Sequence, residues 1–126
     1  MPRPRNGSGL RQRVRFERRT ETDDGAGNVR GAWAAIETAP DQALERACSL
    51  TPTRGGEAVQ SARLAGTASW DLWLRNEAAI RSLTTADRVV DARGLLGTFN
   101  ITFGPLDMDG DGRWLFMQLT SGVADG

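Results

Sequence analysis

Residues 10–20, LRQRVRFERRT, alternate between apolar and charged side chains and set the expectation for the whole fold. A period of two places successive side chains on opposite faces of a β-strand, so this pattern predicts a strand with one exposed, charged face. Leu10, Val14 and Phe16 are expected on the apolar face. The charged face would carry Arg11, Arg13, Arg15, Glu17 and Arg19.

Further segments along the chain have the same strand character. In residues 98–103, Phe99, Ile101 and Phe103 are expected on one face. Residues 113–120 are apolar on both faces, which is typical of a central strand or of one that a partner covers. Short strands at regular spacing predict a mainly β fold, either a small barrel or a sandwich. The six expected strands are residues 10–20, 29–38, 68–75, 88–92, 98–103 and 113–120.

Residues 41–66 interrupt this pattern. Residues 43–47 and 57–65 are rich in helix formers, and Pro52 and two glycines separate them. We therefore expect a long loop with short helices, inserted between the second and third strands. Long connections of this kind are usually functional, and we expect this one to become ordered only on assembly. Residues 1–9 are expected to form a flexible basic arm, and residues 10–126 a single domain.

Composition restricts the chemistry of this 126-residue chain. It contains no His, Tyr or Lys, and its single cysteine, Cys48, cannot form an internal disulfide. Without His, a Ser-His-Asp or Cys-His site cannot be built, and only carboxylate chemistry, with sixteen Asp and Glu, remains open. We predict no enzymatic activity, cofactor or metal. Neither a membrane span nor a signal peptide is apparent, and we expect a soluble protein made for the cytoplasm.

Charge is unevenly distributed along the chain. Residues 1–20 contain seven arginines and one acid, whereas residues 21–126 contain nine arginines and fifteen acids. A basic segment on an acidic body can contact DNA, or it can dock on the acidic surface of a neighbouring copy. The first possibility defines an alternative function, a small nucleic-acid-binding β-module that uses the N-terminal arginines.

Other motifs have a functional and a structural interpretation. Asp107, Asp109 and Asp111 follow the start of a calcium loop, but the twelfth position is Gln118 instead of Glu, which favours an acidic turn over weak calcium binding. Residues 54–57, RGGE, lack the Lys of a phosphate-binding loop and are interpreted as a flexible loop. Trp73 falls opposite the apolar face of its strand, so both a core position and an intersubunit contact remain open for it.

Taken in order, several motifs make the chain similar to a known family. They are residues 9–20 (GLRQRVRFERRT), 22–28 (TDDGAGN), 54–57 (RGGE), 62–66 (ARLAG), 85–90 (TADRVV) and 99–101 (FNI), followed by an Asp/Gly turn and an apolar strand. This order and spacing resembles the phage head–tail joining proteins, also called head closure, stopper or head–tail adaptor proteins. The resemblance covers nearly the whole chain from Gly9 onward.

The resemblance implies a structural β-barrel subunit of a ring with six or twelve copies. Such a ring would lie in the neck of a phage or gene transfer agent particle, between the portal–adaptor complex and the tail, and would help to retain packaged DNA in the channel. The virion would be assembled in the bacterial cytoplasm. Candidate contacts to neighbouring copies or partners are Arg11, Arg13, Arg15, Arg54, Glu57, Trp73 and Trp114.

Overall fold

The computed structural model describes residues 9–20, 31–53 and 68–121. Within these residues, the longer strands are β1 (Gln12–Arg19), β5 (Glu45–Pro52), β6 (Ala68–Arg75), β7 (Arg88–Asp91), β8 (Thr98–Leu106) and β9 (Trp114–Ser121). The shorter elements are β2 (Trp33–Ala35), β3 (Glu37–Ala39), β4 (Gln42–Ala43) and the one-turn helix α2 (Ala78–Arg81).

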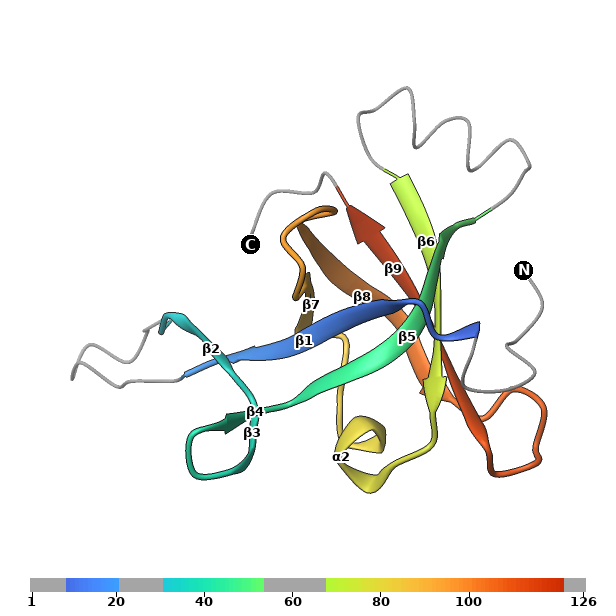
Figure 1. Ribbon diagram of the computed structural model, residues 1–126, viewed down its shortest axis with the longest axis horizontal. Coiled ribbons are helices and arrows are strands. Elements are labelled where there is room, and N and C mark those ends of the chain that lie inside the picture. Colours follow the sequence, from blue (N-terminus) through green and yellow to red (C-terminus); the bar gives the residue numbers. More distant parts are fainter. Residues whose placement is uncertain (1–8, 21–30, 54–67, 122–126) are drawn as a thin grey trace.

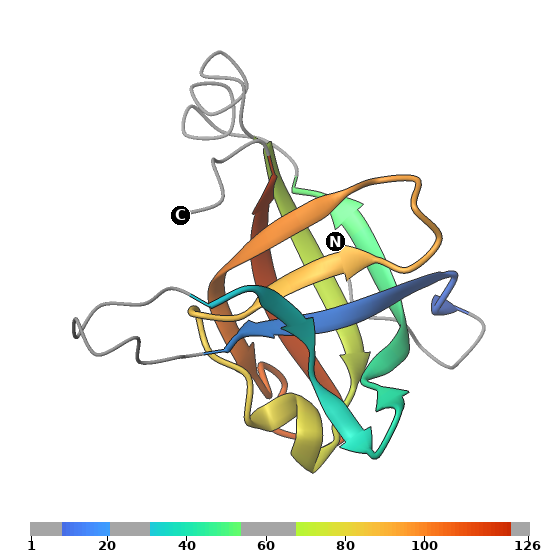
Figure 2. The same cartoon turned by 90° about the vertical axis from the view of Figure 1, so that its left-hand side faces the viewer.

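The longer strands form a closed antiparallel barrel (Figures 1 and 2). Their order is β1-β5-β6-β9-β8-β7, and β7 pairs back onto β1 to close the sheet. β2 is an additional strand on β1, with Glu17 opposite Ala35, and β3 and β4 form a separate small hairpin. Closure gives each barrel strand a neighbour on both sides. The mainly β prediction is therefore confirmed, and its barrel form applies instead of a sandwich.

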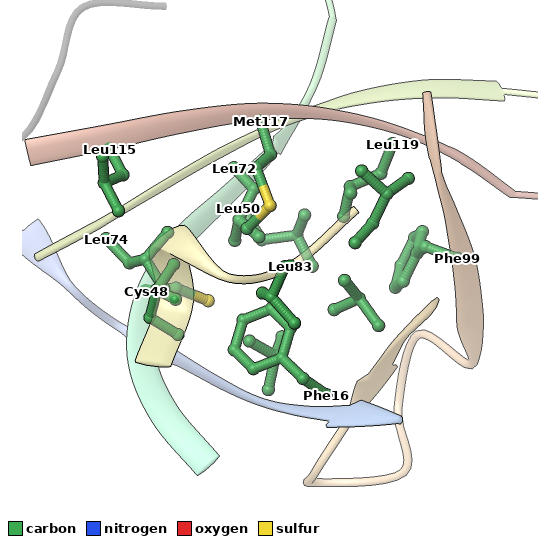
Figure 3. Close-up of a cluster of buried hydrophobic side chains, with 14 of the residues drawn as sticks. Phe16, Cys48, Leu50, Leu72, Leu74, Leu83, Phe99, Leu115, Met117 and Leu119 are labelled. Carbon is green, nitrogen blue, oxygen red and sulfur yellow. The ribbon is translucent and has the colours of Figure 1, made fainter. Parts of the chain in front are cut away.

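Apolar side chains from every barrel strand fill the interior (Figure 3). Val14 and Phe16 of β1 point inward, as their spacing predicts. Ile80 of α2 and Leu83 join this core from the end of the barrel where α2 lies (Figures 1 and 2). Leu72 and Leu74 are inside and Trp73 is outside, which confirms the predicted faces of β6. The remaining core residues are Leu44, Cys48, Leu50, Val89, Phe99, Ile101, Leu115, Met117 and Leu119.

The expected insertion at residues 41–66 requires correction. Residues 45–52 are not a loop or a helix but β5, a barrel strand between β1 and β6. The inward row of Leu44, Cys48 and Leu50 is interrupted by Arg46, which pairs with Val14 and donates from Nε to Glu77 at 2.7 Å. This charged residue, together with neighbouring alanines, hides the period of two. Residues 54–67 lie outside the described residues, and so does the helix expected at 57–65.

Other expected boundaries shift by smaller amounts. The strand expected at residues 29–38 is divided between β2 and β3, with residues 29 and 30 outside the described part, and β3 ends at Ala39, before Pro40. The expected connection at residues 76–87 contains α2. Leu10 packs on the outer face of the barrel, not in the core as expected, because β1 begins only at Gln12. The expected arm at 1–9 and loop at 22–28 fall almost wholly outside the described residues.

Strand β8 contains a bulge that changes which way its aromatic side chains point. Ile101 is paired with Leu119, but Phe103 is paired with Gln118, so one extra residue of β8 lies between the two pairs. Such a bulge reverses the alternation of faces. Phe99 and Ile101 point into the core as predicted, whereas Phe103 points outward and is 40% exposed. The predicted inward position of Phe103 is therefore wrong.

Candidate functional site

The outer face of β1 carries the predicted row of arginines, but the structure divides them into two groups. Arg11 and Arg13 are exposed. Arg15 donates from Nε and Nη2 to Glu17 at 3.2 Å, and Arg88 of β7 donates from Nε to the other oxygen of Glu17 at 2.7 Å. Glu17 is buried, and its ion pair with Arg88 joins β1 to β7. Of the arginines predicted on this face, Arg11 and Arg13 therefore remain exposed, and their role as partner contacts stays a prediction.

A second set of contacts holds the additional strand β2 in place. Two guanidinium groups lie over the indole ring of Trp33, Arg88 at 4.4 Å and Arg19 at 4.9 Å from its centroid. Guanidinium groups interact favourably with the electron-rich face of an indole. Arg19 and Arg88 are thus engaged by the chain's own residues, and the charged face of β1 is in large part structural.

The end of the barrel near α2 has an ion pair between the half-exposed Arg18 and the buried Asp87, which the sequence pattern did not indicate. Arg18 donates to both carboxylate oxygens of Asp87, at 2.8 and 3.0 Å, and Asp87 also accepts from the backbone N–H of Thr84. Asp87 is 2% exposed. Asp87, in the motif at residues 85–90, therefore joins the connection after α2 to β1. In the sequence, only the presence of Arg18 could have indicated this contact.

An aromatic cluster covers the outer face of β6 and β9. Trp73 lies 4.9 Å from Phe116 between ring centroids, Trp114 packs beside them, and Leu10 covers part of the group. Arg75 lies over Trp114 at 5.5 Å. Trp73 and Trp114 are only 7% and 5% exposed, so the chain's own residues cover most of both indoles. Their role as partner contacts stays a prediction.

The exposed apolar side chains occupy other positions, which sequence reasoning missed. Phe103, Leu106 and Met108 are 40%, 46% and 52% exposed, at and beyond the end of β8. Phe103 lies 6.2 Å from Phe116 between ring centroids, so this group continues the aromatic cluster outward. Leu95 and Leu96 are 73% and 39% exposed on the connection before β8. The two groups lie at opposite ends of β8 (Figure 1).

A buried carboxylate organises the connection that carries the two leucines. Asp91 accepts hydrogen bonds from the backbone N–H groups of Arg93, Leu95 and Leu96, at 3.0, 3.2 and 2.9 Å, and from Nε of Arg93. Burial of the Asp91 carboxylate acts to raise its pKa, but the bonds from Arg93 and Leu96 outweigh this effect and lower the pKa below its ordinary value. The charged form of Asp91 therefore holds the loop at residues 93–96 in place.

The acidic motif after β8 is a turn, as predicted. Asp107 accepts from the backbone N–H groups of Gly110 and Gly112, at 2.9 and 2.8 Å, and Asp111 accepts from Arg113 N–H at 3.0 Å. Both oxygens of Asp107 are thus used to shape the backbone. In the part of the chain that the structure describes, no group of three His, Cys, Asp or Glu side chains is placed to hold a metal ion.

Cys48 is also part of the interior. Burial is the largest influence on its thiol and raises the pKa to about 12, so the thiolate that acts as a nucleophile is scarce at neutral pH.

None of the described helices has the length and apolar character to span a membrane. Arg54 and Glu57, the remaining predicted contacts, lie outside the described residues.

Comparisons with known proteins found a family and a solved structure to which the chain is similar. Residues 5–122 match the model of a family described as phage head completion protein. Among solved structures, the chain is similar to a chain in the "virion of native gene transfer agent (GTA) particle". The two share a TM-score of 0.59 and 24% identity, over 96% of this chain and 98% of that chain, which shows a common fold. No curated protein matches the sequence.

Proposed function

The chain belongs to the phage head completion protein family, and we propose that it is a structural subunit of a head-to-tail connector, or stopper, in a phage-like particle. The observation that carries this proposal is the family match over residues 5–122, nearly the entire chain. The similar chain in a gene transfer agent virion supports it, because that chain matches over nearly its full length and has the same fold. Head closure is the structural role that fits this family.

The finer parts of the proposal concern assembly. Six or twelve copies would form a ring in the neck of the particle, bind the portal–adaptor complex on one side and the tail on the other, and help to retain packaged DNA. The exposed apolar groups at opposite ends of β8 support repeated contacts between copies. The exposed Arg11 and Arg13 add a basic surface to a chain whose residues 21–126 are net acidic. Assembly would take place in the bacterial cytoplasm.

We propose a non-enzymatic role, as the structural family suggests. The sequence contains no His, and Cys48, its one thiol, is buried with a raised pKa. A nucleophile activated by His therefore cannot be built from these residues, and Cys48 is poorly placed to act as one.

The alternative, a nucleic-acid-binding β-module, depends on the exposed Arg11 and Arg13. The variant R11Q/R13Q would lose affinity for duplex DNA, and the salt dependence of binding would become shallower, if these residues neutralise phosphates. R113Q, which removes an exposed arginine from the turn after β8, is the matched control. A connector subunit should instead bind free DNA weakly, with little difference between the two variants.

The decisive test is electron microscopy of particles from cells in which the gene is deleted. If the chain joins heads to tails, DNA-filled or leaked heads and separate complete tails will accumulate. Restoring the gene on a plasmid should restore joined particles, which excludes an effect on neighbouring genes. Intact tailed particles in the deletion strain would overturn the proposal.

A further inference from the structure

Two apolar surfaces of this chain differ in their charged surroundings. We call Leu95 and Leu96 the leucine tip, and Phe103, Leu106 and Met108 the apolar shelf. β8 runs between them, and its nine residues span roughly 30 Å at the usual rise of an extended strand. The two surfaces therefore face different neighbours, and neither can cover the other within one copy (Figure 1).

The leucine tip is held in a fixed conformation and has basic surroundings. Asp91 accepts three backbone hydrogen bonds from residues 93–96, and Gly97 C=O accepts from Asp91 N–H at 2.9 Å. The same loop bonds to β1 through Ala92 N–H and Arg13 C=O, at 3.0 Å, which places it beside the exposed Arg13 and Arg11. A preorganised loop loses little conformational entropy when its side chains dock.

The apolar shelf lies beside an acidic turn. Phe103 is supported from below by Phe116, and Met108 lies within the turn that Asp107 shapes. The turn carries three aspartates and one arginine, a net charge opposite in sign to that beside the leucine tip. Its members are Asp107, Asp109, Asp111 and Arg113.

Building on the proposed function, we infer that the leucine tip of one copy docks on the apolar shelf of the next copy. The contact joins an apolar tip with a basic margin to an apolar shelf with an acidic margin, so hydrophobicity and charge favour a second copy of this chain as the occupant. Because tip and shelf are different surfaces, the contact is head-to-tail and produces a ring when the rotation between copies closes. The five apolar side chains act as its anchors within a larger contact.

The experiment uses two full-length variants, L95S/L96S without the tip and L106S/M108S without the shelf. T85S/A86S, which changes two exposed residues of another loop, is the matched control. Sedimentation velocity of the parental chain and of the control should show concentration-dependent association that weakens with salt. Each double variant should associate roughly tenfold or more weakly, because anchors of an interface contribute most of its affinity.

Mixing the two variants gives a sharper result. Each retains the surface that the other lacks, so an equimolar mixture should form a heterodimer and no larger species. As a second measurement, L95C and M108C should form a mixed disulfide under mild oxidation, while buried Cys48 stays reduced. Circular dichroism and urea unfolding verify that all variants are folded, and L95Q replaces L95S/L96S should that variant unfold.

Three outcomes would overturn the inference: a parental chain that stays monomeric at its highest soluble concentration, variants that associate like the parent, or a mixture that remains monomeric. These outcomes leave the proposed connector role standing, because that role is tested by the deletion strain. Conversely, tailed particles in the deletion strain would refute the connector role while the contact between copies persists in solution.

Discussion

Strand β8 uses similar residues on both sides of its bulge, yet the two halves meet different surroundings. Before the bulge, Phe99 and Ile101 are 1% and 3% exposed, and Phe99 lies edge-on to Trp70 with ring centroids 5.4 Å apart. After it, Phe103 and Leu106 are 40% and 46% exposed. Two register shifts, between Ile101 and Phe103 and between Phe103 and Leu106, therefore separate a buried half of the strand from an exposed half.

This difference shows that amino-acid type alone does not identify a contact surface. Phe99 and Phe103 are both phenylalanines, four positions apart, and only the changed register places them on opposite faces of the sheet. Stability and assembly should therefore be separable along a single strand. The following four predictions test that separation, from the largest expected effect to the smallest.

The largest effect is expected from shortening the aromatic side chains on the two sides of the bulge. F99A should lower the free energy of unfolding by about 3–5 kcal/mol, because it removes a fully buried ring. F103A should lower it by about 1 kcal/mol or less, because it loses mainly a half-exposed contact with Phe116. Urea unfolding followed by tryptophan fluorescence measures both. Equal losses would mean that the two halves share one role.

A second register shift of β8, between Phe103 and Leu106, can be altered at Gly104. This residue has a φ of 85°, and a Cβ atom there would clash with the carbonyl oxygen of Phe116. G104A should therefore cost about 2 kcal/mol, because both the left-handed backbone and the contact are unfavourable. G110A, at a positive-φ glycine with no atoms near the added Cβ, is the control and should cost less. The comparison uses the same unfolding measurement.

The loop that leads into β8 should make stability depend on acidity through Asp91. Because hydrogen bonds lower its pKa in the folded chain, its contribution is present above the ordinary value of 3.8 and is lost as the pH falls below that value. D91N should cost roughly 1–3 kcal/mol at neutral pH and should flatten the acid dependence of unfolding. D109N, in the exposed turn after β8, is the comparison variant. An unchanged acid profile for D91N would contradict the prediction.

The smallest change is expected in the reactivity of Cys48. With a pKa of about 12 and no exposed surface, its thiol should react with a maleimide or disulfide reagent only when the barrel opens. Labelling should stay slow in F103A and become faster in F99A, because only the second variant destabilises the interior. Above pH 9.0, the ordinary pKa, the thiol ionises more readily in the unfolded chain than in the folded one. The free energy of unfolding should therefore decline as the pH rises above 9.0. Fast labelling of the parental chain would contradict a closed core.

The sequence predicted a mainly β fold, a small barrel or a sandwich, because several of its segments have short strand patterns at regular spacing. Val14 and Phe16 in β1, and Leu115 and Met117 in β9, lie inside as their spacing indicates. β5 was missed because Arg46 occupies an inward-facing row at the barrel end, where Glu77 pairs with it. A single sequence carries no local signal for a partner that lies so far along the chain.

The candidate site was less predictable than the fold. Arg15 and Arg19 form part of the alternating charged pattern of residues 10–20, but only the structure reveals that Glu17 and Trp33 engage them. The exposure of Phe103 depends on a bulge in the pairing of β8 with β9, a strand that follows later in the chain. Likewise, the role of Asp91 depends on backbone groups of a loop that forms only once β7 and β8 are paired. Tertiary contacts decide all three.

The pairing of β1 with both β5 and β7 has a consequence for how the chain is made. β1 leaves the ribosome first, yet its pairs Val14–Asp91 and Phe16–Val89 join it to residues that are synthesised much later. Contacts between such distant residues slow folding, because a long segment must be ordered before they form. During synthesis the arginine-rich strand β1 therefore waits without its β7 neighbour, and the barrel closes only after β7, β8 and β9 have been made. The charges on β1 are well suited to that interval, since charged strand edges resist aggregation.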